Sequence, residues 1–537
     1  MEIFKKVPIP KTGIVIVRSN PNKIPYVYHY VETFRNDKGK PDNKRVSIGK
    51  LSEVDNMLIP NKTYFELFDK EITKEDCIEL SNTLRFGNFV LFDKITQDLE
   101  LDKILQYAFG NIYQQILIMA FYVTDYSSKM LYIDDWCEEN YVFDNMIIEP
   151  KRTSDYFKEI TKTGKDIFFK NWIEQNSIDE YVAYDVTSRS SYSENNELNE
   201  YGYNRDGENL AQTNIGIFFG EKSKMPIYYN EYSGSITDVT HLPFMMQGVK
   251  ELELEVSKFV LDTGFYSQSN ILDMCENKLK FIVCMRKVKL LLELVYKKIN
   301  KIKSSEYYIL EHGIYGNSYN QKFGKYNCKI HIFYDSAKLA AKENEFYTKI
   351  EGYRKELELL EKMNKNNFKK YSKYFDINVN ENDETFTFLE NHKKVNEEFK
   401  LLGYFACISN DLTLTSSEVV EIYRKKDVVE KHHDNMKNFS DFDRLGTHST
   451  KTAVGKELIG FISLIYKSYI EKITSEYAKK NKMTTEKMLL ELGKIKVQKV
   501  NGVKRLVQPI SAKQEKILQL FQIKKDDVSK MAKEIIF

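Results

Sequence analysis

The chain has 537 residues, of which 42% are hydrophobic and 29% charged, and its formal net charge is only +2 from 80 basic and 78 acidic side chains. This composition is typical of a folded protein of several domains and excludes a largely disordered chain. A nucleic-acid-binding protein is often more basic overall, so any DNA contact must come from local basic patches.

Neither a zinc ribbon nor a membrane span is expected. The six cysteines are far apart and form no C-x-x-C pair, and scattered free thiols are typical of a reducing cytoplasm. No run of 18 or more apolar residues occurs. The N-terminal segment MEIFKKVPIPKTGIVIV has a five-residue apolar run and two prolines, which is not typical of a signal peptide. We therefore expect a cytoplasmic protein without a membrane partner.

Residues 13–50 predict a small antiparallel sheet. GIVIV, PYVYHYVETF and KRVSIGK have strand-like patterns, and the segment FRNDKGKPDNKR is rich in turn-forming residues. Basic side chains near this turn are suited to contact a phosphate backbone. They are Lys38, Lys40, Lys44 and Arg45. The alternative is a solvated hairpin whose charges keep a sheet edge soluble.

Residues 75–178 predict helices, because apolar residues recur there every three or four positions. Two interpretations stay open for this helical segment. It is either a DNA-binding or dimerisation region, or a helical layer packed on the domain that follows.

From residue 180 the pattern changes to strands. EYVAYDVTS predicts a buried strand that ends at Asp185, and NIGIFFG and PIYYNEYSG predict two more. A helix over 239–251, a strand ending at Asp262, a helix at SQSNILDMCEN and a strand over 280–285 follow. The predicted order is three strands, helix, strand, helix, strand.

Residues 286–398 interrupt this alternation with short strands around a long helical segment. Five apolar residues there are spaced four, three, four and three, which predicts a heptad-like seam in a helical hairpin. They are Phe346, Ile350, Tyr353, Leu357 and Leu360. The sheet pattern then resumes with LLGYFACISN, followed by a helix that contains EIYRKKDVVEKHHDNMK (421–437), an apolar helix over 455–470 and a charged helical tail over 471–537.

Three acids stand out in this order of elements. Asp185 and Asp262 each close a predicted strand, and Glu430 lies on the later helix. Carboxylates gathered at one edge of a sheet repel one another unless a cation neutralises them, and oxygen ligands suit Mg²⁺. A pair of such ions serves phosphodiester chemistry. Each acid alone is more often a turn, cap or surface residue, but the combination is more specific.

The helix over 421–437 carries a second pattern. Tyr423, Lys426, Glu430 and Lys437 are three, four and seven residues apart, which places them on one helical face. Together with YDVTS, SGSITD and VLDTGFYS, this pattern resembles the bacterial insertion-sequence DDE transposases of the insertion-sequence family four group, marked by a tyrosine–arginine–glutamate–lysine signature. Lys426 stands at the arginine position, and lysine does not grip phosphate bidentately as arginine does.

The resemblance implies an α/β protein whose RNase H-like, mixed-sheet catalytic core is interrupted by an insertion domain. An N-terminal small β-sheet and a helical DNA-binding region precede that core. The expected domains are a small antiparallel β DNA-binding domain (1–70), a helical DNA-binding or dimerisation region (71–178), the first part of the core (179–285), an insertion domain with a helical hairpin (286–398), the second part of the core (399–475) and a C-terminal helical tail (476–537).

The resemblance also implies a function, namely that of an insertion-sequence DNA transposase. Such an enzyme binds terminal inverted repeats, cleaves DNA at the element ends by two-metal phosphodiester hydrolysis and joins the 3′-hydroxyl to target DNA. In this interpretation Asp185, Asp262 and Glu430 are catalytic and hold Mg²⁺, for which Mn²⁺ substitutes. Lys437 contacts a phosphate near the cut, while Tyr423 and Lys426 orient the end. The implied partners are double-stranded DNA and a second copy of the chain, as a homodimer in the DNA complex, in a bacterial cytoplasm at the nucleoid.

Two other functions compete with this one. The first is a catalytically silent DNA-binding protein derived from a transposase, which the presence of all three acids disfavours. The second is a protein-interaction module based on the heptad-like seam, which explains none of the acids. Arg189, Lys287 and His448 are additional candidates, either for contacts with end DNA or for surface and capping roles.

Overall fold

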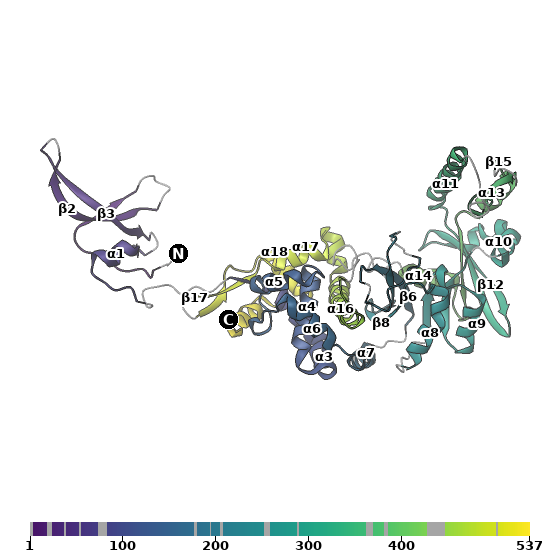
Figure 1. The fold of residues 1–537 in the computed structure, drawn as a ribbon, viewed down its shortest axis with the longest axis horizontal. Helices are drawn as coiled ribbons and strands as arrows, with labels where there is room; N and C mark the ends of the chain where they lie inside the picture. Colours follow the sequence, from purple (N-terminus) through teal and green to yellow (C-terminus); the bar gives the residue numbers. More distant parts are fainter. Residues whose placement is uncertain are drawn as a thin grey trace. The chain divides into compact units, whose positions relative to one another are not determined.

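The computed structural model (Figure 1) divides into two compact units, which we describe separately. The first comprises Met1–Lys94, Asp134–Ile147 and Glu486–Phe537, and the second comprises Ile95–Ile133 and Ile148–Thr485. The structure describes residues 4–18, 24–36, 39–52, 55–73, 83–176, 180–193, 195–203, 208–251, 258–286, 289–360, 369–380, 385–426, 446–500 and 503–536. Among these residues, none of the helices combines the length and the apolar character needed to cross a membrane.

An antiparallel sheet opens the first unit, and Figure 1 shows two of its strands as a long paired ribbon. Its strands, in spatial order, are β1 (Ile14–Val17), β2 (Tyr26–Arg35), β3 (Pro41–Leu51) and β4 (Leu58–Pro60). Val27, Ile48 and Leu58 are fully buried beneath helix α1 (Lys62–Leu67). The three strands predicted from the sequence are present, and β4 extends the sheet by one strand.

The C-terminal part of the first unit differs from the helical tail predicted for it. Strands β17 (Lys496–Val500) and β18 (Val503–Leu506) form a three-stranded sheet with β5 (Leu84–Arg85). Helices α17 (Thr485–Leu492), α18 (Ala512–Leu520) and α19 (Lys525–Glu534) flank these strands in the sequence. In KVQKV only Val497 is fully buried, so the surrounding lysines concealed the strand pattern.

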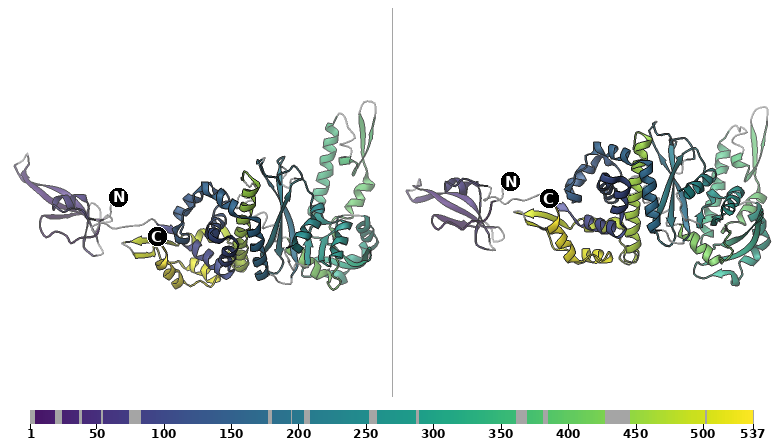
Figure 2. Two further views of the ribbon diagram at one scale, coloured as in Figure 1. Left: turned by 60° about the horizontal axis from the view of Figure 1, so that its bottom comes forward. Right: turned by 90° about the horizontal axis from the view of Figure 1, so that it is seen from below.

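Helices dominate the N-terminal part of the second unit. They are the C-terminal end of α2 (Gly87–Asp98), α3 (Leu101–Phe109), α4 (Tyr113–Asp125), α6 (Pro150–Glu159) and α7 (Lys162–Asn176). The 32-residue helix α16 (Thr450–Asn481) packs against α4 and α6 on one side and against the sheet on the other. Figure 2 shows this helix between the helical layer and the strands. Because nearly every residue from Thr452 to Ser468 is buried, α16 joins the two layers.

A nine-stranded mixed sheet forms the centre of the second unit. In spatial order its strands are β11 (Tyr308–Ile309), β12 (Ile314–Phe323), β13 (Tyr326–Tyr334), β16 (Tyr404–Ser409), β10 (Lys280–Cys284), β9 (Lys258–Leu261), β6 (Val182–Ser190), β7 (Gln212–Gly220) and β8 (Pro226–Ser233). Strands β6, β7 and β8 run antiparallel, while β9 and β10 run parallel to β6. Helices α8 (Asp238–Glu251) and α9 (Gln268–Glu276) connect β8 to β9 and β9 to β10, so the order from β6 to β10 is the one predicted.

The strand that carries Asp185 is longer than predicted. The sequence places its end at Asp185, but β6 continues to Ser190. The continuation pairs with β7 alone, since the pairing of β6 with β9 stops at Tyr184. The apolar pattern of the sequence did not predict this extension, because residues 187–190 are polar although they are buried.

The segment that interrupts the core contributes to two structures. Strands β11, β12 and β13 extend the central sheet through β16. The later elements of the segment pack as a hydrophobic cluster of their own, in which the heptad-like seam lies against residues such as Tyr374, Phe375 and Val395, whereas the first helix of the segment contacts β12 and β13. The elements of this segment outside the sheet are α10 (Lys289–Ile302), α11 (Leu339–Leu359), β14 (Phe375–Val379), β15 (Phe386–Glu390) and α13 (His392–Phe399).

Candidate active site

Asp185 on β6 and Asp262 directly after β9 occupy neighbouring positions, because β6 and β9 are adjacent and parallel. Tyr184 and Leu261, which directly precede the two acids, are the last paired residues of β6 and β9. Neighbouring strands are about 4.8 Å apart, so the two carboxylates originate close together. The pairing ends at this point, because β9 stops at Leu261 while β6 continues, so both acids directly follow the paired residues.

Helix α14 (Ser416–Lys425) and its C-cap residue bring two residues of the predicted signature to these acids. Tyr423 donates a hydrogen bond from its hydroxyl to Oδ1 of Asp262 at 3.1 Å. Lys426, the C-cap residue of this helix, places Nζ 3.6 Å from Oδ1 of Asp185. This distance defines an ion pair rather than a direct hydrogen bond. The lysine side chain is only 2% exposed and that of Asp185 is 20% exposed, so water screens the pair weakly.

The position of α14 follows from its sequence. Val419 and Val420 are fully buried in the core cluster of the sheet, and Tyr423 packs against the same cluster. A capping box between Thr415 and Glu418 fixes the start of the helix. Burial raises the pKa of Tyr423, and the neighbouring Cys284 and Asp262 add to this effect. The hydroxyl is therefore held as a hydrogen-bond donor.

Three consecutive basic residues end α14, and only Lys426 of these approaches Asp185. The side chains of Arg424 and Lys425 point to other acceptors within the fold. Those acceptors are the carbonyl oxygen of His312 and the carboxylate of Asp335 for Arg424, and the carboxylates of Glu221 and Glu421 for Lys425. Of these three basic residues, Lys426 is therefore the one that pairs with an acid of the candidate site.

The other predicted members of the site lie outside the described residues. These are Glu430, the predicted third acid, together with Lys437, Lys38 and Lys287. Within the described part of the chain, no group of three or more His, Cys, Asp or Glu side chains is arranged to hold a metal ion. Asp185 and Asp262 supply carboxylate oxygens, the donor type that Mg²⁺ prefers, so the two described acids fit such an ion.

Comparison with known proteins identifies the family of this chain. A model of the family described as "Transposase DDE domain" matches residues 180–465, which is more than half of the chain. This chain belongs to the transposase DDE domain family. No curated protein matches it. Among solved structures, the cryo-EM structure of the piggyBac transposase synaptic complex with hairpin DNA is similar with a TM-score of 0.36 and 13% sequence identity, over 76% of this chain and 79% of that chain.

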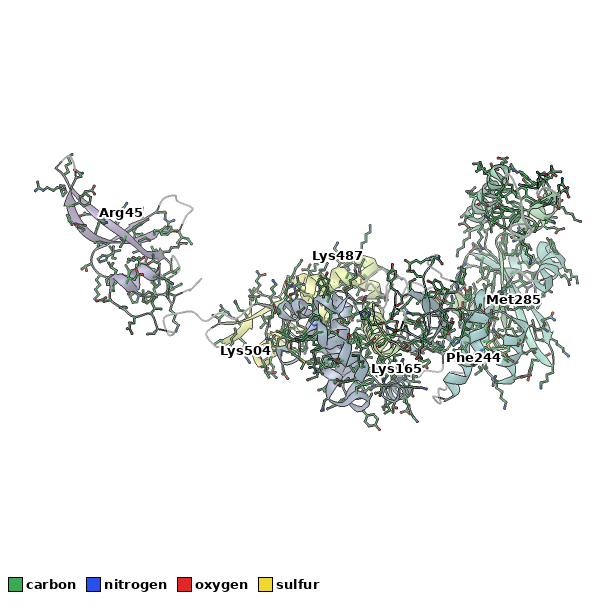
Figure 3. All side chains as sticks on the ribbon, viewed as in Figure 1. Arg45, Lys165, Phe244, Met285, Lys487 and Lys504 are labelled. Atoms are coloured by element: carbon green, nitrogen blue, oxygen red, sulfur yellow. The ribbon has the colours of Figure 1, made fainter. Side chains whose placement is uncertain are left out.

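Outside the matched DDE domain, the described members of the predicted basic set lie on or directly beside the N-terminal sheet. Lys40, Lys44 and Arg45 are exposed, and Figure 3 labels Arg45 on this sheet. The guanidinium of Arg45 lies 5.2 Å from the ring centre of Tyr28. A second such pair joins Lys50 to Tyr26 at 5.3 Å. Sequence reasoning missed the aromatic partners, although the alternation of tyrosines in YVYHY carries the signal.

Within the DDE domain, a polar network that the sequence did not reveal lies beside Asp185. Tyr184 donates to Oδ1 of Asn230 at 3.1 Å, and the amide nitrogen of Asn230 lies 2.5 Å from Nε2 of His241. Burial lowers the pKa of His241 to about 4, so the ring is neutral at pH 7 and accepts this hydrogen bond. Gly216 provides the space for Tyr184, since a Cβ there would lie 2.0 Å from the tyrosine hydroxyl. The network fixes the residue next to Asp185.

Arg189, a candidate for a contact with end DNA, instead forms a buried ion pair of the DDE domain. Its side chain is 2% exposed and contacts the carboxylate of Glu457 on α16, which is 3% exposed. Burial raises the pKa of Glu457 to about 7, while the positive charge of Arg189 opposes this increase. The pair connects β6 to α16.

Proposed function

We propose that this chain is the DNA transposase of an insertion sequence. It binds the terminal inverted repeats, cleaves the DNA at the element ends and joins the freed 3′-hydroxyl to target DNA by transesterification. The observation that carries the proposal is the placement of Asp185 and Asp262 side by side where the pairing of β6 with β9 ends, with Tyr423 of α14 on one acid and its C-cap residue Lys426 on the other. The order β8-β7-β6-β9-β10, three antiparallel strands followed by two parallel ones, supports an RNase H-like core.

In this proposal Asp185, Asp262 and Glu430 hold two divalent cations, with Mg²⁺ as the physiological ion and Mn²⁺ as a substitute. When bound, the cations would activate a water or a 3′-hydroxyl and stabilise the leaving oxygen. Tyr423 orients Asp262 through its hydrogen bond, and Lys426 offsets the repulsion between the carboxylates before the cations bind.

Contacts with DNA complete the proposal. Lys437 contacts a phosphate near the cut, and Tyr423 and Lys426 orient the DNA end once it is bound. The exposed basic residues of β3 and their tyrosine neighbours support the N-terminal sheet as a DNA-binding surface, because cations neutralise phosphates and aromatic rings add stacking area. Pairing of two ends implies a homodimer in the DNA complex. The protein would act on the bacterial chromosome in the cytoplasm.

The test uses Asp185→Asn, Asp262→Asn and Glu430→Gln with duplexes taken from the DNA that flanks the reading frame. We expect each variant to lose more than about 100-fold of Mg²⁺-dependent cleavage, because even residues that only orient metal ligands contribute about 10- to 100-fold. DNA binding, measured by electrophoretic shift, should persist. Asp135→Asn, at an exposed aspartate of α5 (Ile133–Glu139), is the control and should cleave like the wild type.

The catalytically silent alternative makes a different prediction for the same assay. It expects the wild-type chain to bind the end duplex without cleaving it, even when Mn²⁺ replaces Mg²⁺. Undiminished cleavage by any of the three acid variants would refute the assignment of that acid.

A further inference from the structure

A basic pocket lies in the second unit, apart from the acids. It has a volume of about 1040 Å³ and is lined by residues of α6, of the 3-10 helix η3 (Met130–Tyr132) and of the segment that leads into α16, which includes the candidate residue His448. Four lysines line it, and no described lining residue carries a carboxylate. These lysines are Lys129, Lys151, Lys158 and Lys456. Such a lining attracts anions.

Two of these lysines have acidic neighbours outside the pocket. Lys151 lies 2.8 Å from Glu149, and Lys158 lies 3.6 Å from Asp155. The side chains of both ion pairs, the two lysines and their two acidic partners, are more than half exposed. Exposed ion pairs of this kind contribute at most about 1 kcal/mol. An anion in the pocket therefore competes for both lysines at little cost.

The N-terminal end of α16 adds hydrogen-bond donors to the same pocket. Ser449 caps this 32-residue helix and exchanges hydrogen bonds with Thr452, and both residues line the pocket. The N-terminus of a helix carries a partial positive charge that favours anions. Thr447 gives an independent sign of a ligand. Its side chain lines the pocket and is 8% exposed, and its hydroxyl has no hydrogen-bond partner among the described residues.

Lys456 places a buried positive charge at the pocket. It lies one helical turn beyond Thr452 on α16 and is 5% exposed. Its Nζ is 3.9 Å from the position that a Cβ would take on Gly446, the first described residue of the segment that leads into α16. Lysine is rarely buried to this extent unless charged or polar groups accompany it. An anion in the pocket would stabilise this buried charge further.

The walls of the pocket are held together by close packing. A Cβ on Gly455 would lie only 2.2 Å from the carbonyl oxygen of Phe157, so α16 and α6 approach each other at the distance that glycine permits. Phe157 itself is buried and lines the pocket. The pocket is therefore formed before any ligand binds.

We propose that this pocket binds the phosphodiester backbone of DNA, as a site separate from the acids. The proposal rests on the proposed function, which makes DNA the substrate. Lysine ammonium groups, hydroxyls and a helix N-terminus are the donors that proteins direct at phosphate oxygens. The pocket also has a fixed relation to β6. Glu457, the neighbour of Lys456, pairs with Arg189 four residues beyond Asp185 on that strand. A backbone held in the pocket would thus be positioned with respect to the strand of the first acid.

The test compares charge-reversed variants of the full chain. Lys129→Glu/Lys151→Glu changes two exposed pocket lysines, and the matched control Lys162→Glu/Lys479→Glu changes two exposed lysines elsewhere in the second unit. Fluorescence anisotropy with a labelled random-sequence duplex measures Kd over a series of NaCl concentrations. For the pocket variant we expect a Kd weaker by at least about tenfold at low salt, and a salt slope smaller by about 1 for each phosphate that the variant no longer neutralises. A pocket variant that matches the control in both quantities overturns the proposal.

Thr447→Val provides a second variant that leaves the charge unchanged. Because the hydroxyl has no partner among the described residues of the free protein, its removal should not lower the midpoint of urea unfolding. It should weaken DNA binding, and unchanged binding would count against the pocket.

Calorimetry with inorganic phosphate alone distinguishes a site for the DNA backbone from a site for a small anion. Saturable phosphate binding that the pocket variants abolish, together with unchanged DNA affinity, would mean a small-anion site and would overturn the DNA proposal. DNA affinity separates this proposal from the proposed function. Asp185→Asn should bind the duplex like the wild type without cleaving it, whereas the pocket variants should bind it more weakly. A wild-type chain that binds DNA through the pocket but never cleaves would refute only the proposed function.

Discussion

Tyr423 donates a hydrogen bond from its hydroxyl to Oδ1 of Asp262 at 3.1 Å, which connects helix α14 to the acid that follows β9. Three residues later, Lys426 reaches Asp185 on the neighbouring strand β6. Three residues of an α-helix rise about 4.5 Å, close to the spacing of about 4.8 Å between adjacent strands. Positions i and i+3 along one helix can therefore contact residues on two neighbouring strands, which explains the interval of three residues between Tyr423 and Lys426.

Removal of the tyrosine hydroxyl tests this relationship. Tyr423→Phe should reduce Mg²⁺-dependent cleavage by about tenfold, because a residue that only orients a metal ligand typically contributes about 10- to 100-fold. Its unfolding free energy in urea should fall by no more than about 3 kcal/mol, the upper range for a hydrogen bond to a charged group. Tyr404→Phe is the matched control, since the buried Tyr404 hydroxyl has no hydrogen-bond partner among the described residues. Equal activity of both variants would argue against the orienting role of Tyr423.

The ion pair of Lys426 predicts an effect on metal binding. Lys426→Met removes a positive charge 3.6 Å from Asp185, so the carboxylates gain affinity for a divalent cation while the metal-free protein loses about 1 to 3 kcal/mol of stability. The rise in Tm on addition of MgCl₂ should therefore be larger in this variant than in the wild type. Lys426→Arg keeps the charge, so its Tm response should equal that of the wild type. An equal response in all three proteins would contradict this prediction.

Local patterns in the sequence account well for the centre of the fold. The alternation of strands and helices between residues 180 and 285 predicted the order β6, β7, β8, α8, β9, α9, β10. The expectation that strand ends meet at one edge of a sheet predicted that Asp185 and Asp262 lie close to each other, and the two acids directly follow paired residues of adjacent strands. Both inferences need only short-range periodicity and one topological rule.

Such local patterns do not predict contacts between segments that are distant in the sequence. Nothing local in the sequence indicates that β13 pairs with β16, whose residues follow some 70 positions later, and so extends the central sheet. Buried polar residues are also hard to recognise from the sequence, because their partners come from other elements. Arg189 illustrates this best, since an arginine next to a predicted site suggests DNA and only its contact with Glu457 shows a structural role.

The packing of α6 on α16 makes a prediction about stability. Gly455→Ala should lower the free energy of unfolding by about 1 to 3 kcal/mol, because the new Cβ would overlap the backbone of Phe157. Gly352→Ala is the matched control, as it lies in the exposed middle of α11 with nothing within 4 Å of the new Cβ. It should stabilise the protein by about 0.5 to 1 kcal/mol through helix propensity. Urea unfolding measures both, and a Gly455→Ala variant as stable as the wild type would show that the helices separate easily.

The buried pair of Arg189 and Glu457 predicts non-additive mutations. Arg189→Met should cost about 3 to 5 kcal/mol of unfolding free energy, because it leaves an uncompensated carboxylate in the interior. Arg189→Met/Glu457→Leu should cost less than the single change, since no buried charge of the pair remains. The double-mutant cycle in urea gives the coupling energy, and additive losses would show that the two residues act independently.

His331 predicts how stability depends on pH. Burial lowers the pKa of His331 to about 4, with a smaller contribution from Lys329, whereas an unfolded histidine titrates near about 6.5. The unfolded state therefore binds more protons between these values, so stability is lost as the pH falls from about 6.5 to 4. Nδ1 of His331 lies 3.1 Å from the hydroxyl of Ser416, and Nε2 has no hydrogen-bond partner among the described residues, so no carboxylate in that part of the chain compensates a charged ring.

His331→Gln removes this titration while it keeps a polar group near Ser416. Between pH 7 and pH 4.5 the variant should lose about 2 to 3 kcal/mol less unfolding free energy than the wild type, since each pKa unit corresponds to about 1.4 kcal/mol. Urea unfolding at the two pH values measures the difference. If wild type and variant lose the same amount, acid destabilisation originates in other groups, and the buried His241, whose pKa is also lowered to about 4, becomes the next residue to substitute.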